Sequence, residues 1–135
     1  MRDFVLDASA AIDYAQGGSG ANKMEQLLAD AVRQQLGLYI SVLHLAEVFY
    51  LTWQKTGEQR AREIIASFSR LPVQIIDVSL PQALKAAELK ARHRIPFVDC
   101  VAAALTLQQH ATLVTADRDF EKLGRHFPIL WLTRP

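Results

Sequence analysis

The stretch Phe4-Val5-Leu6-Asp7-Ala8-Ser9-Ala10-Ala11-Ile12 decides how this chain folds. Residues 4–6 are a short apolar run, which is typical of a buried strand in a parallel sheet. Ser9 is expected to cap a helix through residues 10–12, because its hydroxyl can accept hydrogen bonds from free backbone N–H groups. Asp7 is therefore predicted at the carboxyl end of a central strand, beside a helix N-terminus, where ligands collect in open parallel sheets.

Strands and helices alternate along the rest of the chain. Apolar runs predict further strands at residues 38–40, 73–76, 112–114 and 129–132. Helices are predicted after a capping box at Asn22 and Glu25, after Ser41, over residues 58–70, 79–92 and 98–109, and briefly over 118–123. This alternation indicates an α/β fold, a three-layer α/β/α sandwich with a central parallel sheet of four to five strands. We expect a single domain over residues 1–135.

The composition excludes several classes of protein. Fifteen basic and fourteen acidic residues give a formal net charge of +1, so any binding of nucleic acid needs a local basic patch. The single cysteine, Cys100, rules out an internal disulfide and suits a reducing compartment. The first residues show no signal-peptide pattern, and the longest apolar region, residues 38–53, is too short and too polar to span a bilayer. We therefore expect a soluble cytoplasmic protein with no membrane partner.

Four carboxylates stand in apolar surroundings, whereas most acidic residues of the chain do not. Asp7 ends the first strand, Glu47 lies inside the helix after the second strand, and Asp99 lies in the first turn of a later helix. Asp117 follows the strand at residues 112–114. We expect all four at one edge of the sheet, because the carboxyl ends of parallel strands share an edge. The acids with polar neighbours are expected to be solvated: Asp13, Asp30, Glu58, Glu63, Glu88 and Glu121.

Bringing these acids together carries an electrostatic cost that a cation offsets. Two carboxylates about 4 Å apart repel by roughly 4 kcal/mol at an effective dielectric constant of about 20. A hard divalent cation, bound through oxygen atoms, turns this repulsion into attraction. The chain has one cysteine and four histidines without H-E-x-x-H spacing, which excludes a conventional soft-metal site. Mg²⁺ or Mn²⁺ is therefore the expected ion.

Each acid also has a purely structural explanation. Asp7 and Asp117 would cap the turns after their strands, and Asp99 would cap its helix or complement the helix dipole. For Glu47, which lies inside a helix, a salt bridge to a basic side chain is the structural alternative. The joint placement of all four at strand and helix ends is what favours a functional site.

The residues around these acids resemble the PIN-domain ribonuclease family over nearly the whole chain. The resemblance rests on segments in the family's order: Leu6 to Ser9, Ser41 to Val48, Phe97 to Ala104 and Val114 to Phe120. The compact size resembles in particular the VapC-type toxins of bacterial and archaeal toxin–antitoxin pairs. The likeness implies an endoribonuclease that cuts single-stranded or loop RNA with Mg²⁺ or Mn²⁺, leaving a 5′-phosphate and a 3′-hydroxyl. The implied catalytic and metal-binding acids are Asp7, Glu47, Asp99 and Asp117.

The same resemblance extends to neighbouring residues and to partners. Ser9 and Thr115 match the family's hydroxyls near the site, where substrate binding and turn or helix capping are both open roles. Asp119 stands at a position that is acidic in some relatives, which makes it a further candidate metal ligand. The likeness also implies a homodimer, and a cognate antitoxin that docks across the third and fourth predicted helices.

Basic residues lie close in the sequence to two of the acids. We hypothesise that they hold RNA phosphates around the negative pocket, a kind of contact that positions RNA without specifying its sequence. Basic side chains at a helix end would equally favour the helix dipole. The residues assigned to substrate binding on this basis are Lys90, Arg92, Arg94 and Arg118.

Two other functions stay open at this point. One is a catalytically silent PIN-like module that binds RNA or a protein partner without metal and without cleavage. The other is a receiver-like signalling domain phosphorylated at Asp77, which closes the third predicted strand. The receiver is disfavoured because the first strand lacks an adjacent acidic pair and Glu47 has no role in it.

Overall fold

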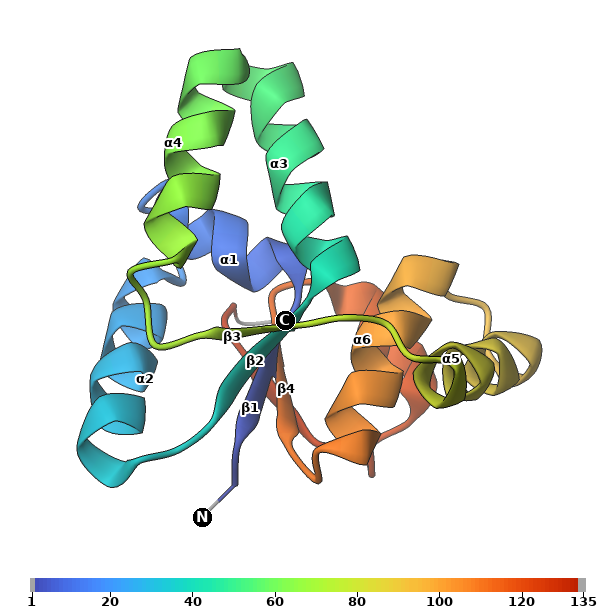
Figure 1. The fold of residues 1–135 in the computed structure, drawn as a ribbon. Coiled ribbons are helices and arrows are strands. Elements are labelled where there is room, and N and C mark those ends of the chain that lie inside the picture. The colour runs from blue at the N-terminus through green and yellow to red at the C-terminus, as the bar shows by residue number, and fades with distance from the viewer. Residues whose placement is uncertain (1, 134–135) are drawn as a thin grey trace.

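A computed structural model describes residues 2–133, which form a five-stranded parallel sheet between layers of helices (Figure 1). The strands are β1 (Phe4–Leu6), β2 (Leu38–Ser41), β3 (Gln74–Ile76), β4 (Thr112–Thr115) and β5 (Ile129–Trp131). They lie in the order β3-β2-β1-β4-β5, and every neighbouring pair is parallel. The predicted three-layer sandwich is confirmed, with the sheet at the upper end of the expected strand number.

The helices follow the predicted order, with boundaries that differ by a few residues. They are α1 (Ala8–Ala15), α2 (Ala21–Gln34), α3 (Val42–Thr56), α4 (Glu58–Phe68), α5 (Leu80–Arg92), α6 (Phe97–Gln108) and the 3-10 helix η1 (Arg118–Leu123). Helices α3 and α4 form a hairpin that projects past the carboxyl ends of the strands (Figure 1). Its turn needs Gly57, whose φ of 100° is a conformation that other residues rarely adopt. Across residues 2–133, none of the helices is long and apolar enough to cross a membrane.

Two of the predicted helix caps are wrong, and the cap at Ser41 is confirmed. The Ser41 side chain accepts from the backbone N–H of Leu43 and caps α3, as expected. Helix α1 is capped by Asp7, and Ser9 lies inside the helix, because the carboxylate already accepts from the N–H of Ala10. No capping box at Asn22 forms. The cap residue of α2 lies two residues earlier, at Gly20, and it makes no side-chain cap.

The core fills both faces of the sheet. Helices α1 and α2 cover one face, where Leu6, Ile40 and Val114 are buried. Helix α6 covers the other face, where Val5 and Leu113 are buried, and α5 packs on its outer side (Figure 1). Burial on both faces explains why the strands read as continuous apolar runs instead of alternating ones.

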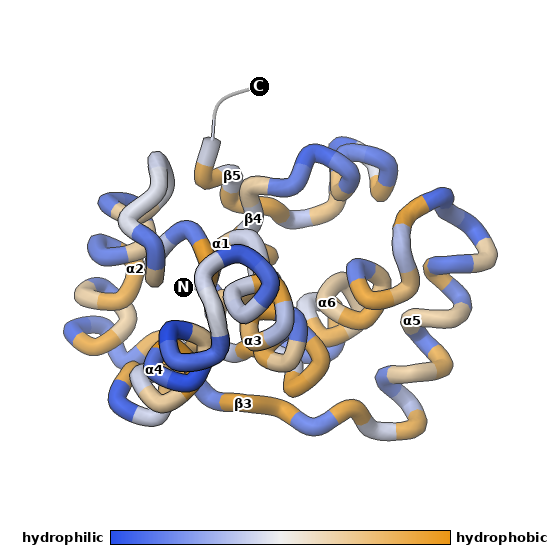
Figure 2. Tube along the Cα trace, turned by 90° about the horizontal axis from the view of Figure 1, so that it is seen from above, coloured by the Kyte–Doolittle hydropathy of each residue, from blue (hydrophilic) through white to orange (hydrophobic). Residues whose placement is uncertain are grey.

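The edge strand β3 is less protected than its neighbour. Ile75 of β3 is 44% exposed, whereas Ile40, its partner in the register of β2, is 0% exposed. Figure 2 shows β3 as a hydrophobic segment along the outer edge of the molecule. Isoleucine is therefore exposed on β3 and buried on the adjacent strand β2.

We expect Ile40→Ala to lower the free energy of unfolding by about 2–5 kcal/mol, because it leaves a cavity in the core. Ile75→Ala is the matched control and should cost less than about 1 kcal/mol. Urea unfolding followed by circular dichroism measures both values. Equal losses in the two variants would contradict the assigned burial.

Candidate functional site

The four predicted acids line one cavity of about 470 Å³. Asp7 and Asp117 reach it from the ends of β1 and β4, which are neighbouring strands. Glu47 reaches it from α3, and Asp99 from the first turn of α6. Four separate elements of the chain thus contribute carboxylates to the same hollow at the carboxyl edge of the sheet.

Asp7 is held in place by hydrogen bonds to both of its carboxylate oxygens. Its Oδ1 atom accepts from the N–H of Ala10 at 2.9 Å and from the Ser9 hydroxyl at 2.7 Å. Its Oδ2 atom accepts from the Thr115 hydroxyl at 2.5 Å. Because the side chain is only 3% exposed, these bonds fix its direction, so the carboxylate is pre-organised.

Ser9 and Thr115 also tie Asp7 to the neighbouring strand. The Ser9 Oγ atom accepts from the N–H of Ala116 at 3.0 Å, just beyond the end of β4. The Thr115 Oγ1 atom accepts from the N–H of Asp117 at 2.9 Å. The structure therefore gives these two hydroxyls the task of positioning acids, while the predicted contact with substrate stays a prediction.

Asp117 and Asp119 belong to the turn that follows β4. Asp117 caps η1 by accepting from the N–H of Asp119 at 2.9 Å. Carboxylate oxygens of Asp99, Asp117 and Asp119 all lie within 4.8 Å of one another. Asp119 is exposed, so it approaches the group from the solvent side.

Burial and mutual repulsion raise the pKa values of three acids. The pKa of Asp7 rises to about 6, mainly through burial, although its hydrogen bonds oppose the shift. The pKa of Asp99 rises to about 7, through burial first and then through the nearby charges of Asp117, Asp7, Glu47 and Asp119. The pKa of Glu47 is raised by burial and by Asp7 and Asp117. The protein thus holds a negative charge that it does not neutralise by itself.

This donor set fits a hard divalent cation. The groups that converge are carboxylate oxygens, which Mg²⁺ and Mn²⁺ prefer over nitrogen or sulfur. Burial first, and then the charges of neighbouring acids, raises the pKa values of Asp7 and Asp99, and a cation between the carboxylates would offset both costs. Within residues 2–133, none of the residues that line the cavity is lysine or arginine.

The structural alternatives account for part of the role of three of the four acids. Asp7 and Asp117 do act as caps, so part of their role is structural. Glu47 forms no salt bridge with a basic side chain in the part of the chain that the structure describes. Asp99 does not cap α6, whose cap residue is Pro96, but it lies in the first turn of that helix, where its charge complements the helix dipole. Glu47 is therefore the acid that capping, the helix dipole and ion pairing leave unexplained.

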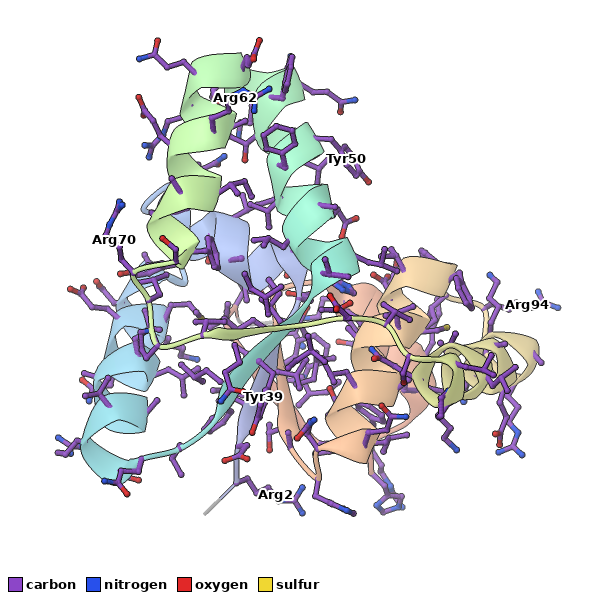
Figure 3. The ribbon with its side chains drawn as sticks, viewed as in Figure 1. Arg2, Tyr39, Tyr50, Arg62, Arg70 and Arg94 are labelled. Atoms are coloured by element: carbon purple, nitrogen blue, oxygen red, sulfur yellow. The ribbon has the colours of Figure 1, made fainter. Side chains whose placement is uncertain are left out.

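The basic residues assigned to RNA have other contacts in this structure. Lys90 donates to the backbone oxygen of Ile95 at 2.8 Å, and Arg92 forms a salt bridge with Glu88 at 3.0 Å. Arg94 points away from the body of the protein at the end of α5 (Figure 3). These three residues are not among those that line the acidic cavity, and their role in RNA binding stays a prediction.

Arg118 is fastened to the end of the described chain. Its guanidinium lies 4.1 Å from the centre of the Trp131 ring and donates to the backbone oxygen of Thr133. It also pairs with Glu121 at 3.1 Å. Arg118 therefore holds Thr133, which lines the acidic cavity, and its predicted contact with substrate is not tested by these bonds.

Sequence reasoning missed one acid of the cavity. Asp13 was expected to be solvated, but it lines the acidic hollow and accepts from the N–H of Gly20 at 2.6 Å. A Cβ atom on Gly20 would lie 2.2 Å from an Asp13 carboxylate oxygen, so glycine is needed there. The helical spacing of Ser9, Asp13 and Gln16 could have indicated this position, because it places their side chains on one face of the first helix. Asp77, in contrast, is exposed after β3 and does not appear among the lining residues.

Comparison with known structures finds the same fold in toxin–antitoxin proteins. DNA-bound VapBC from Salmonella typhimurium matches with a TM-score of 0.77 and 18% identity, over 98% of this chain and 100% of that one. VapBC2 from Rickettsia felis, bound to a promoter DNA fragment, matches with a TM-score of 0.74 and 20% identity, over 94% and 96%. VapC20 from Mycobacterium tuberculosis, a toxin that cleaves the sarcin–ricin loop, matches with a TM-score of 0.69 and 19% identity, over 90% and 95%.

Sequence comparison gives the family. A search of curated protein sequences found no match. The model of the PIN domain matches residues 4–126, which include every acid of the cavity. The fold, the acidic cavity and this match agree, and the chain belongs to the PIN-domain family.

Proposed function

We propose that this protein is a Mg²⁺- or Mn²⁺-dependent endoribonuclease and the toxin of a type II toxin–antitoxin pair. The observation that carries the proposal is the convergence of four carboxylates, from four separate elements, in one cavity without a basic side chain among its described lining residues. Membership of the PIN-domain family supports it, as do structural neighbours that are VapBC toxin–antitoxin proteins. A further neighbour, VapC20, is a toxin that cleaves the sarcin–ricin loop.

In this proposal the acids bind the cation and the hydroxyls orient the acids. The acids that would hold the ion are Asp7, Glu47, Asp99 and Asp117, with Asp119 as a further candidate. A bound divalent cation supplies neutralisation of phosphate charge and a lowered pKa for the attacking water. Ser9 and Thr115 keep the Asp7 carboxylate aimed by their hydrogen bonds, so it does not reorganise when the ion enters. Asp7 and Asp99 must lose any bound proton first, which couples ion binding to pH.

The proposed protein partner is an antitoxin that docks across α3 and α4. Tyr50 is 48% exposed and points outward from α3, and Trp53 is 41% exposed (Figure 3). The Trp53 ring meets the Phe49 ring edge to face at 5.6 Å, and the Arg62 guanidinium of α4 lies over both rings. Exposed aromatic and arginine side chains of this kind are enriched at protein interfaces. We also propose that the protein forms a homodimer. Its proposed location is the cytoplasm, where it would meet RNA and the antitoxin.

The first test of this function concerns how pH and metal change the stability of the protein. The folded-state pKa values of about 6 for Asp7 and about 7 for Asp99 lie above those of an unfolded chain. The folded protein therefore binds more protons between about pH 4 and pH 7, and its free energy of unfolding falls as the pH rises through that window. We expect Asp99→Asn to melt roughly 5 °C above the metal-free wild type at pH 8, with a smaller difference at pH 5.5. Saturating Mn²⁺ at pH 8 should stabilise the wild type more than the variant.

Thermal unfolding of both proteins across this pH range measures the effect. Comparing the two removes the contribution of other groups, such as His44, whose pKa burial lowers to about 4. Asp77→Asn is the matched control, because it removes an exposed carboxylate outside the cavity and should follow the wild type. Parallel curves for the wild type and Asp99→Asn would show that folding does not raise the pKa of Asp99.

The second prediction concerns catalysis. We expect the wild type to cut single-stranded RNA with Mg²⁺ or Mn²⁺ and to stop when EDTA is added. Asp7→Asn and Asp99→Asn should each lower the cleavage rate roughly 100-fold or more, because each removes a charge that the cation needs. Asp77→Asn should cut at the wild-type rate. Gel analysis of a labelled RNA measures all four proteins.

Two results would count against this activity. RNA binding without metal and without cleavage would identify a catalytically silent module. Cleavage by both aspartate variants at the wild-type rate would show that the cavity is not the active site.

The third prediction concerns the antitoxin. In an Asp99→Asn background, which removes the proposed toxicity, tagged protein expressed from its native operon should co-purify with a small protein. Tyr50→Ala and Trp53→Ala should each weaken that complex by about tenfold or more, because they remove exposed aromatic anchors. Leu84→Ala on α5 is the control, since Leu84 is 61% exposed but lies on another helix. Absence of any small partner would contradict the assignment.

A further inference from the structure

A second hollow opens directly from the acidic cavity. It has a volume of about 440 Å³ and is lined by Ile12, Gln16, Leu51, Gln54 and Lys55. Ile12, Gln16 and Leu51 line both hollows, so the two adjoin each other and together form a groove along α1 and α3. These helices pack against each other (Figure 1). We call the part of this groove beyond the acids the side groove.

Each of the two helices presents one strip of side chains to this groove. On α3, Glu47, Leu51 and Gln54 follow at the i, i+4, i+7 spacing of a single helix face. On α1 and its end, Ser9, Ile12 and Gln16 follow at the i, i+3, i+7 spacing, which also places them on one face. Both strips run from groups at the acidic cavity, through an aliphatic side chain, to an amide. The groove therefore changes from negative to apolar to neutral polar along its length.

We propose that the side groove binds the nucleoside next to the scissile phosphate. This inference rests on the proposed ribonuclease function. Ile12 is half-buried and Leu51 is 38% exposed, so both offer aliphatic surface to the faces of a base. Nucleases and related enzymes hold single-stranded bases between apolar or aromatic side chains and read their edges by hydrogen bonds.

The amides supply the edge contacts. Gln16 and Gln54 are exposed, and each carries a carbonyl acceptor and an NH₂ donor, which match the mixed donors and acceptors of a base edge. The Gln16 Oε1 atom accepts from the Lys55 ammonium at 3.5 Å, which orients the Gln16 NH₂ group as a donor. A site of this kind discriminates between bases, whereas contacts to phosphate do not.

Charge favours RNA as the occupant. Among the described residues, Lys55 is the one basic side chain that lines either hollow. It stands in the part of the groove away from the acids, where the next phosphate of an RNA strand would need a cation. In this arrangement the scissile phosphate lies at the acids, the nucleoside lies in the side groove, and the next phosphate lies beside Lys55. This is the order of chemical groups along an RNA strand. Tyr50 and Trp53 of α3 are not among the residues that line either hollow, and they serve the protein partner in the proposal above.

The double variant Gln16→Ala/Gln54→Ala tests the inference, with Gln34→Ala on α2 as the matched control. All three positions are exposed, so the proteins should fold alike, and thermal unfolding checks this. For each protein, kcat and KM are measured on RNA and on bis(p-nitrophenyl) phosphate, a diester without a base. We expect the ratio of kcat/KM on RNA to that on the diester to fall about tenfold in the double variant, mainly through KM. The base preference next to the cleavage site should also weaken, and the control should match the wild type.

The outcomes separate this inference from the proposed function. A wild type that cuts no RNA with Mg²⁺ or Mn²⁺ would overturn both. A wild type that cuts RNA, with an unchanged ratio and base preference in the double variant, would overturn the side groove alone. A double variant that keeps wild-type RNA kinetics but loses its antitoxin would show that the groove is a protein interface, which also overturns the inference.

Discussion

The buried carboxylate of Asp7 is the point at which the fold and the site depend on each other. Its two oxygens accept hydrogen bonds from the start of α1 and from the Thr115 hydroxyl at the end of β4, so one side chain joins a helix to the neighbouring strand. The same burial raises its pKa to about 6, which makes its negative charge costly. The fold thus holds in place a charge that it does not stabilise fully. Ion-binding sites commonly carry such an electrostatic cost. If the empty cavity were already free of it, binding the ion would release less free energy.

The order of the strands explains why the acids meet. From β1 the chain proceeds to β2 and β3 on one side, then crosses to β4 and β5 on the other. In open parallel sheets this reversal leaves a crevice beyond the carboxyl ends of the two central strands. Asp7 and Asp117 follow those strands, β1 and β4. Glu47 and Asp99 reach the same crevice from α3, which follows β2, and from α6, which precedes β4. Acids from segments on both sides of the crossover therefore line the crevice.

Prediction from the sequence succeeded where the cause is local or periodic. The strands, the helix order and the Ser41 cap follow from apolar runs and capping chemistry, and they are confirmed. It was wrong about Ser9 as a cap, because the Asp7 carboxylate already accepts from the N–H of Ala10, and about the box at Asn22, because α2 already begins at Ala21. The sequence offered no sign of the Arg118 contacts with Trp131 and Thr133, since these join the turn after β4 to the end of the described chain.

Sequence alone determined the parallel α/β architecture and the set of acids that apolar neighbours would bring out of water, because both depend on hydrophobic pattern and on the cost of burying charge. Only the tertiary structure decided the mutual approach of Asp99, Asp117 and Asp119, the inclusion of Asp13, and the side groove between α1 and α3. These features depend on distances between side chains from different elements. Such distances are set by how the helices pack on the sheet, and a pattern along one chain segment carries no record of that packing.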